Sequence, residues 1–298
     1  MLTALVRLLS HLPLSLLQKI GSASGRLVAT IAPGYRRHLI ANLEQAGYAT
    51  ANDPELITRA AGEAGKGALE LAYVWMRPQA EVLSLTRATG WAAVETARRE
   101  GRGIVFLTPH LGCFEVTAQF YANNREAGAP LTVLYRRPRK SWLAPLIEGC
   151  RPRENLALAP ADLSGVRRLA RALKRGEAIG MLPDQVPSRG EGVWAHFFGK
   201  PAYTMTLPAR LQQLTGAALL LAHGERLADG RGWTVHFSRL EAPLSGDPVV
   251  AATQINAALE SLIRANPEQY LWGYNRYKKP RSAEAPPSGT QPSPKAKA

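Results

Sequence analysis

Short apolar runs alternate with longer segments of helical periodicity through the middle of the chain, and this alternation constrains the fold more than any other feature. The runs are four or five residues long and cover 104–107, 131–135, 178–182, 217–221 and 233–237. Helical segments cover 114–127, 163–175 and 205–215. Short apolar runs bounded by turn formers are typical of strands buried on both faces. The sequence therefore predicts an α/β fold, with a central, mostly parallel or mixed sheet layered with helices.

The segments on either side of this region have a different character. Residues 1–80 contain apolar positions three and four apart, as do residues 92–100 and 249–264, which predicts helices. We expect an N-terminal helical, membrane-associating region over 1–80 and an α/β domain over 81–280. Residues 281–298 are rich in Pro, Ser, Ala and Lys. Such a segment buries too little apolar surface to order itself, which predicts a disordered tail.

The first twenty residues are apolar but interrupted. Apolar side chains from Leu2 to Ile20 recur at helical spacing, with Arg7, His11 and Lys19 between them. A membrane-spanning helix needs about 20 mostly apolar residues, and this stretch falls short. No small-residue cleavage site follows it, which argues against a secretory signal. The pattern fits a helix lying in a membrane interface and, equally well, a helix packed on the protein's own core.

The chain is strongly basic. Its 298 residues include 37 Lys and Arg against 23 Asp and Glu, a formal charge of +14. A basic surface attracts nucleic acid, anionic lipid or an acidic protein, and composition does not choose among them. The sequence has no helix-turn-helix, zinc-finger or basic aromatic strand pattern, so we expect no nucleic-acid partner.

The cysteines predict no metal chemistry. Cys113 and Cys150 form neither a CxxC pair nor part of a ligand cluster, so we expect free thiols, no metal and no cofactor. Cys113 is interpreted as a small packing residue rather than a nucleophile.

His110 is the candidate catalytic histidine, because it alone among the six histidines lies between a strand-like run and a helix-like segment. The carboxyl ends of buried strands face the crevice where α/β proteins bind ligands. Glu115 comes five residues later, which is about 140° around a continuous helix. The two side chains can therefore meet only if His110 lies in a turn that Pro109 and Gly112 permit. A carboxylate beside a neutral imidazole makes a general base for a hydroxyl. Without further signals, a structural histidine remains the alternative.

Six sequence blocks give this pair a context. Together they resemble the late acyltransferase family of lipid A biosynthesis, the lauroyl and myristoyl transferases. That family belongs to the wider glycerolipid acyltransferase superfamily, which has a His-x4-Asp/Glu motif. The resemblance extends from about residue 8 to residue 280. Cys113 and Phe114 depart from it, since the family has Asn and Trp there, and Arg137 lengthens the second block. The blocks are His110–Glu115, Tyr135–Pro138, Arg151–Arg153, Leu182–Gln185, Phe197–Thr204 and Pro267–Trp272.

The resemblance implies a glycerolipid acyltransferase-like fold and an acyltransferase activity. The acyl donor would be acyl carrier protein and the acceptor a hydroxyl of a lipid A precursor, which is a phosphorylated glycolipid. His110 would act as the general base and Glu115 would orient it. Arg151 or Arg153 would bind phosphate or stabilise the oxyanion, and Asp184 would hold a basic partner or shape the site. The implied substrate-binding residues are Arg136, Arg137, Arg151, Arg153 and Asp184.

The implied location is the cytoplasmic face of the bacterial inner membrane, where the basic charge suits an anionic surface and an acidic carrier protein. The main alternative is an O-acyltransferase for another membrane acceptor, such as a lysophospholipid, an ornithine lipid or a mannosylated glycolipid, because the motifs do not encode the acceptor. A non-catalytic membrane adaptor is a further alternative, but an adaptor would not need both His110 and Glu115.

Overall fold

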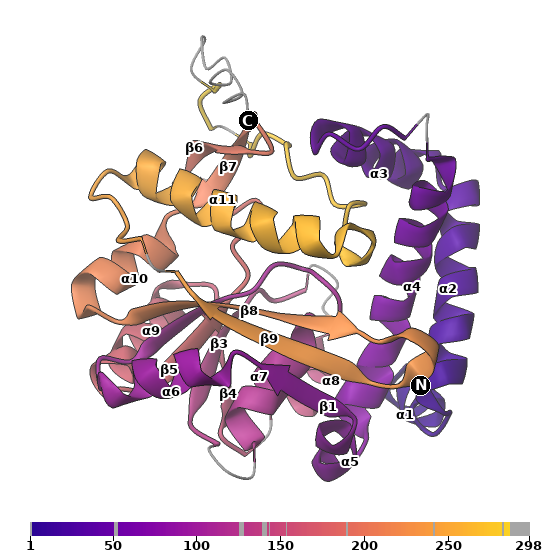
Figure 1. The fold of residues 1–298 in the computed structure, drawn as a ribbon, viewed down its shortest axis with the longest axis horizontal. Helices are drawn as coiled ribbons and strands as arrows, with labels where there is room; N and C mark the ends of the chain where they lie inside the picture. Colours follow the sequence, from indigo (N-terminus) through magenta and orange to yellow (C-terminus); the bar gives the residue numbers. More distant parts are fainter. Residues whose placement is uncertain are drawn as a thin grey trace.

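The computed structural model describes residues 2–50, 53–124, 128–138, 142, 144–152, 154–188, 190–240, 242–281 and 283–286. A seven-stranded sheet crosses the centre of this part of the chain (Figure 1). Its strand order is β1-β9-β8-β2-β5-β3-β4, and every neighbouring pair is parallel except β8 and β9. The strands are β1 (Thr86–Thr89), β2 (Ile104–Leu107), β3 (Leu131–Tyr135), β4 (Leu156–Pro160), β5 (Ala178–Met181), β8 (Ala218–Arg226) and β9 (Trp233–Arg239). The predicted α/β class with a mixed, mostly parallel sheet is confirmed.

All five apolar runs form strands of this sheet, whereas β1 and β4 were not predicted. These two strands lie at the sheet edges. β1 consists of two threonines, an arginine and an alanine and has a single buried position, so it lacks a continuous apolar run. β4 contains only Leu, Ala and Pro, so the apolar pattern could have predicted this strand. A separate antiparallel hairpin of β6 (Gly192–Phe197) and β7 (Lys200–Met205) was also not predicted.

Successive side chains of a strand point to opposite faces of the sheet. Both faces are therefore apolar here, and helices cover both. In β2, Ile104 and Phe106 join the core on the face covered by α6 (Trp91–Arg99) and α7 (Phe114–Asn123). Val105 and Leu107 join the core on the other face. That second face is covered by α9 (Leu163–Lys174), α10 (Leu207–Thr215) and α11 (Pro248–Ala265).

The N-terminal helices form a layer beside the end of the sheet (Figure 1). They are α1 (Leu2–Ser10), α2 (Leu14–Ile31), α3 (Pro33–Gln45), α4 (Pro54–Met76) and α5 (Gln79–Ser84). The amphipathic segment predicted as one helix over 2–20 is split at Pro13, which is the N-cap residue of α2. Proline lacks the backbone donor that a continuous helix would need there.

Glycines bring α2 and α4 into close contact. A Cβ atom on Gly21 would lie 2.6 Å from the Gly65 carbonyl oxygen, and one on Gly25 would lie 2.1 Å from the Ala61 carbonyl oxygen. Another side of α2, turned away from these glycines, exposes the large apolar side chains of Leu16, Ile20, Leu27 and Ile31. Across the described residues, none of the helices has the length and apolar character needed to cross a membrane.

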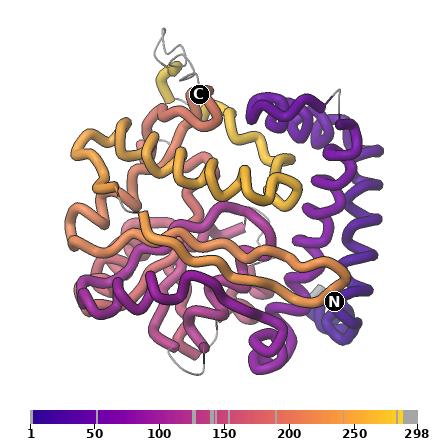
Figure 2. Tube along the Cα trace, in the orientation of Figure 1, coloured from indigo at the N-terminus to yellow at the C-terminus, as the bar shows by residue number. Residues whose placement is uncertain are grey.

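The segment after α11 returns between α3 and the β6–β7 hairpin (Figure 2). The Asn42 side chain of α3 donates hydrogen bonds to the backbone carbonyls of Trp272 and Tyr274. The buried Arg276 guanidinium donates to the Tyr203 carbonyl of β7. The tail predicted to be disordered lies outside the described residues from residue 287 onward.

Candidate active site

A cavity of about 290 Å³ lies at the carboxyl ends of β2, β3 and β5. This is the position where open α/β sheets bind their ligands. Its polar wall residues are His110, Glu115, Arg136, Arg151 and Gln185, and its apolar wall includes Leu71, Trp75, Phe114, Leu134, Ile147 and Leu182. A mostly apolar cavity with a few convergent polar groups suits a ligand with a long hydrocarbon part.

His110 lies in the tight turn that the sequence predicts between β2 and α7. Gly112 has φ +59°, and a Cβ there would lie 2.0 Å from the Gly224 carbonyl oxygen. The closing segment holds the turn from the other side: Gly112 N–H donates to the Gln269 carbonyl, and Leu271 N–H donates to the His110 carbonyl. The turn therefore needs glycine, and residues near position 270 fix its position.

The strand register brings Asp184 to His110. Leu107 at the end of β2 lies opposite Met181 at the end of β5, and the two strands are parallel. His110 and Asp184 each follow three residues later. The His110 Nδ1 atom lies 2.8 Å from Asp184 Oδ1, and the His110 backbone N–H donates to Asp184 Oδ2 over 2.8 Å. In the structure, the basic partner of Asp184 is His110, held by these two contacts.

Asp184 keeps its negative charge despite being buried. Burial alone would raise the pKa of this carboxyl, but His110, through its charge when protonated and through its hydrogen bonds, lowers the pKa below its usual value, with a smaller contribution from Arg276. A carboxylate at Nδ1 fixes the proton of the neutral imidazole on that atom. The lone pair is then on Nε2, which lies 3.1 Å from the side-chain amide of Gln185 in the cavity wall.

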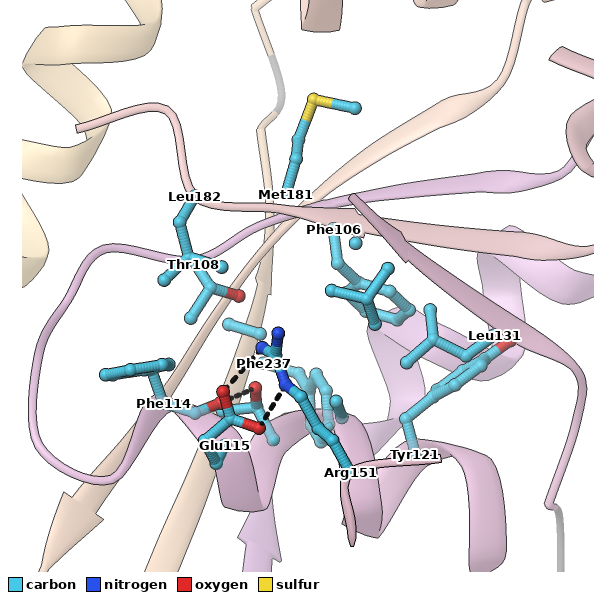
Figure 3. A pocket seen from close by; sticks show the side chains of 15 residues that line it. Phe106, Thr108, Phe114, Glu115, Tyr121, Leu131, Arg151, Met181, Leu182 and Phe237 are labelled. Carbon is cyan, nitrogen blue, oxygen red and sulfur yellow. Dashed lines mark hydrogen bonds and ion pairs between the residues drawn. The ribbon is translucent and has the colours of Figure 1, made fainter. Parts of the chain in front are cut away.

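Glu115 has different partners from those predicted (Figure 3). Its Oε1 lies 2.5 Å from Arg151 Nη2, and its Oε2 accepts hydrogen bonds from Arg151 Nε at 2.7 Å and Trp75 Nε1 at 3.2 Å. Among the described residues, the Nδ1 partner of His110 is Asp184, so the prediction that Glu115 itself orients His110 is corrected. Glu115 is in the first turn of α7, as expected, but its carboxylate is held by the buried cationic group of Arg151.

The four arginines predicted to bind substrate differ in their position relative to the cavity. Arg151 lies in the cavity wall, and its side chain is only 13% exposed. Arg136 also lines the cavity and donates a long hydrogen bond of 3.4 Å to the Val186 carbonyl. Arg137 forms an ion pair with Glu148, and its side chain is 75% exposed. Arg153 lies outside the described residues.

A small apolar hollow lies behind the Glu115–Arg151 ion pair. It has a volume of about 30 Å³, and Phe106, Tyr121, Leu131, Met181 and Phe237 are among the residues around it (Figure 3). A space of this size holds about one water molecule. The ion pair therefore lies between the larger cavity and the apolar core under the sheet.

Three residues at the site were not predicted as functional. Gln185 contacts His110 Nε2, Trp75 donates to Glu115, and the Phe114 ring lies against the imidazole with 4.9 Å between ring centroids. Gln185 directly follows Asp184 in the Leu182–Gln185 block, so this block could have predicted a role for Gln185. Trp75 is distant in sequence from the other site residues, and no sequence pattern pointed to it.

Cys113 is buried, and burial raises the pKa of its thiol well above the usual value. A thiol with a raised pKa supplies little thiolate. Cys113 therefore packs beneath the turn, as expected, and its backbone N–H donates to the Gly224 carbonyl.

The comparisons with known proteins all point to the same family. The chain matches the family model described as bacterial lipid A biosynthesis acyltransferase over residues 1–279. It is 24% identical over 276 residues to the lipid A biosynthesis lauroyltransferase of Escherichia coli strain K12, covering 91% of this chain and 88% of that protein. It is 27% identical over 215 residues to the palmitoleoyltransferase of the same strain, covering 72% of this chain and 68% of that protein.

A relative named for a different acceptor is similar over a shorter stretch. The chain is 30% identical over 166 residues to the phosphatidylinositol mannoside acyltransferase of Mycobacterium tuberculosis strain H37Rv, covering 54% of this chain and 50% of that protein. All three relatives are named as acyl-transferring enzymes. The family model covers nearly the whole folded chain, including the turn of His110 and the closing segment that supports it. This chain is an acyltransferase and belongs to the bacterial lipid A biosynthesis acyltransferase family.

Proposed function

We propose that this enzyme transfers a fatty acyl chain from acyl carrier protein to a hydroxyl of a lipid A precursor, with His110 as the general base. The observation that best supports the proposal is the hydrogen bond of 2.8 Å between His110 Nδ1 and the buried carboxylate of Asp184. It leaves Nε2 as the basic nitrogen of a histidine in the wall of a largely apolar cavity.

In the proposed reaction, the acceptor hydroxyl takes the position at Nε2 that the Gln185 amide occupies. His110 removes the hydroxyl proton while the oxygen attacks the thioester carbonyl. The tetrahedral intermediate then collapses, the carbon–sulfur bond breaks, and the imidazolium returns the proton to the departing sulfur. Asp184 stabilises the imidazolium between these two steps.

Arg151 is the candidate for stabilising the developing oxyanion. Its Nε and Nη2 atoms are held by Glu115, which fixes the orientation of a guanidinium in the cavity wall. A preoriented cation in a site shielded from water stabilises negative charge more effectively than it would in water. We propose that Glu115 contributes by holding Arg151 in place, rather than by contacting His110.

The proposed acceptor rests on the names of the relatives, and the proposed membrane contact rests on the exposed apolar side chains of α2. The two Escherichia coli relatives are named for lipid A biosynthesis, and a phosphorylated glycolipid would suit the arginine Arg136 at the cavity wall. The exposed apolar side of α2 would lie against the cytoplasmic face of the inner membrane. Arg7 of α1 and Lys19 of α2 would then interact with anionic headgroups.

The direct test is His110→Ala, assayed with an acyl-carrier-protein donor and a lipid A precursor. Loss of a general base lowers turnover by about a hundredfold or more. His38→Ala is the matched control, because His38 is exposed on α3 and is not among the residues that line the cavity. A folded His110→Ala protein with near wild-type turnover would refute the general-base assignment.

A different membrane acceptor is the second candidate function. The relative from Mycobacterium tuberculosis is named for acylating a phosphatidylinositol mannoside, and fold alone does not determine the acceptor. Lipid analysis of a deletion strain separates the two candidates. Lipid A that keeps all its acyl chains in that strain would exclude the first acceptor and favour another one.

A further inference from the structure

Helix α9 presents an unneutralised basic face to solvent. Its buried side includes Leu169 and Leu173, which pack in the core on one side of the sheet. The helix contains no Asp or Glu. In the described part of the chain, its outward basic side chains make no ion pair with a carboxylate. This α9 basic face consists of Arg167, Arg168, Arg171 and Lys174, all exposed.

The like charges of the α9 basic face repel one another. Arg167 and Arg171 are four residues apart, and like charges at this spacing lie on one side of a helix and destabilise it. Arg175, just after the helix, is instead neutralised by Glu177.

Arg171 and Lys174 lie in the last turn of α9, where positive charge suits the helix dipole, and Arg168 donates a hydrogen bond to the Leu158 carbonyl. In the described part of the chain no carboxylate neutralises the α9 basic face, so its charges remain available to an external anionic partner.

The first turn of α9 reaches the active-site cavity through a second cavity. This second cavity has a volume of about 350 Å³, and Leu163 and Val166 of α9 form part of its wall. Leu134, Arg136 and Met205 line both cavities. The two cavities therefore adjoin at these residues, between the start of α9 and His110. Leu163 is 65% exposed at the outer wall of the second cavity, where it would contact a docked partner.

The position of α9 favours a water-soluble partner over the membrane. The exposed apolar side of α2 faces away from α4 and the sheet, at one side of the molecule, whereas α9 covers the sheet at the other side (Figure 1). A bilayer in contact with the outer side of α2 therefore lies far from α9. A partner for α9 must be anionic and must approach from the solvent.

We propose that the α9 basic face docks the acidic carrier protein that delivers the acyl thioester. The carrier's long thioester-bearing arm passes through the second cavity to His110. This inference rests on the proposed donor and adds its docking surface. Charge complementarity of this kind mainly accelerates encounter and orients the partner, and salt weakens it.

The test compares two double variants. Arg167→Ala/Arg171→Ala removes two charges of the α9 basic face and introduces the best helix-forming residue. Arg36→Ala/Arg37→Ala is the matched control, because it removes two exposed arginines from α3. Each protein is assayed with acyl carrier protein and with acyl-pantetheine, which presents the same thioester without the protein. Binding of fluorescently labelled carrier protein is measured by anisotropy, which requires no turnover.

We expect the α9 variant to lose about tenfold in kcat/KM with acyl carrier protein, mostly through KM, and a similar factor in binding. Its kcat/KM with acyl-pantetheine and both values of the control variant should stay at the wild-type level. Raising the salt concentration should bring wild type and the α9 variant together.

Other results would overturn the inference in distinguishable ways. Wild-type carrier binding by the α9 variant excludes α9 as the docking surface, whatever the activity. Weaker co-sedimentation of this variant with phosphatidylglycerol vesicles, with unchanged carrier binding, assigns α9 to the membrane instead. A wild-type enzyme that binds the carrier through α9 but transfers acyl groups from neither donor would refute the proposed function and leave the docking surface supported.

Discussion

Asp184 accepts two hydrogen bonds from His110, one from ring Nδ1 and one from the backbone N–H, each 2.8 Å long. One carboxylate thus fixes both the position of the residue and the rotation of its ring. Asp184 is 1% exposed, so water does not compete for these bonds. In proteins a carboxylate at this nitrogen both sets the tautomer and stabilises the imidazolium.

Asp184→Asn should lower kcat by about a hundredfold or more without unfolding the protein. The Asn oxygen can still accept the His110 backbone N–H, but the uncharged amide no longer stabilises an imidazolium. The measurement is kcat for acyl transfer, with circular dichroism to verify the fold. Asp247→Asn is the control, since Asp247 caps α11 at an exposed position. Full activity of Asp184→Asn would show that the carboxylate has no catalytic role.

Glu115→Gln and Arg151→Met should each destabilise the protein more than the double variant does. The two side chains are only 4% and 13% exposed, and removal of one partner leaves an uncompensated buried charge, which costs about 3–5 kcal/mol. The measurement is the free energy of unfolding in urea for all four members of a double-mutant cycle. Additive effects would mean that the ion pair contributes no coupling energy. The double variant should still lack activity if Arg151 stabilises the oxyanion.

Gly112→Ala should abolish activity and destabilise the fold. The residue has φ +59°, and the new Cβ would lie 2.0 Å from the Gly224 carbonyl oxygen, so the His110 turn must move. Gly34→Ala is the matched control, because a Cβ at Gly34 has no neighbour within 4 Å among the described residues and the position is in helix α3. The control should retain or slightly raise Tm. A Tm for Gly112→Ala equal to that of the control would contradict this account of the turn.

His223 should make the protein less stable as the pH falls. The side chain is buried beside His236, and burial, followed by the charge of His236, lowers the pKa of His223 to about 4. Between pH 6.5 and 4 the unfolded chain binds a proton that the folded protein does not, so the free energy of unfolding decreases as the pH drops through this range. The effect should be on the order of 1–3 kcal/mol.

His223→Leu tests this pH dependence. The variant should lose most of the change in unfolding free energy between pH 6.5 and 4, while His38→Leu on the exposed surface of α3 should retain it. Urea unfolding at several pH values gives the comparison. An unchanged pH profile in His223→Leu would assign the acid sensitivity to other groups.

The sequence by itself determined the α/β class, the strand-to-helix turn and the position of His110 within it. These features are local: burial on both faces of a strand requires a continuous apolar run, and the turn requires Gly112 within two residues of His110. The six motif blocks also identified the family correctly. Edge strand β1 escaped prediction because it is partly exposed and lacks that run, whereas β4 has such a run and was overlooked.

Only the tertiary structure decided which carboxylate serves the histidine. Glu115 is five residues from His110 and Asp184 is 74 residues away, so proximity in sequence favoured the wrong partner. Adjacent parallel pairing of β2 with β5 places the residues that follow the two strands side by side, while the first turn of α7 directs Glu115 toward Arg151. Strand order and register arise from packing of the whole sheet, and local periodicity does not contain that information.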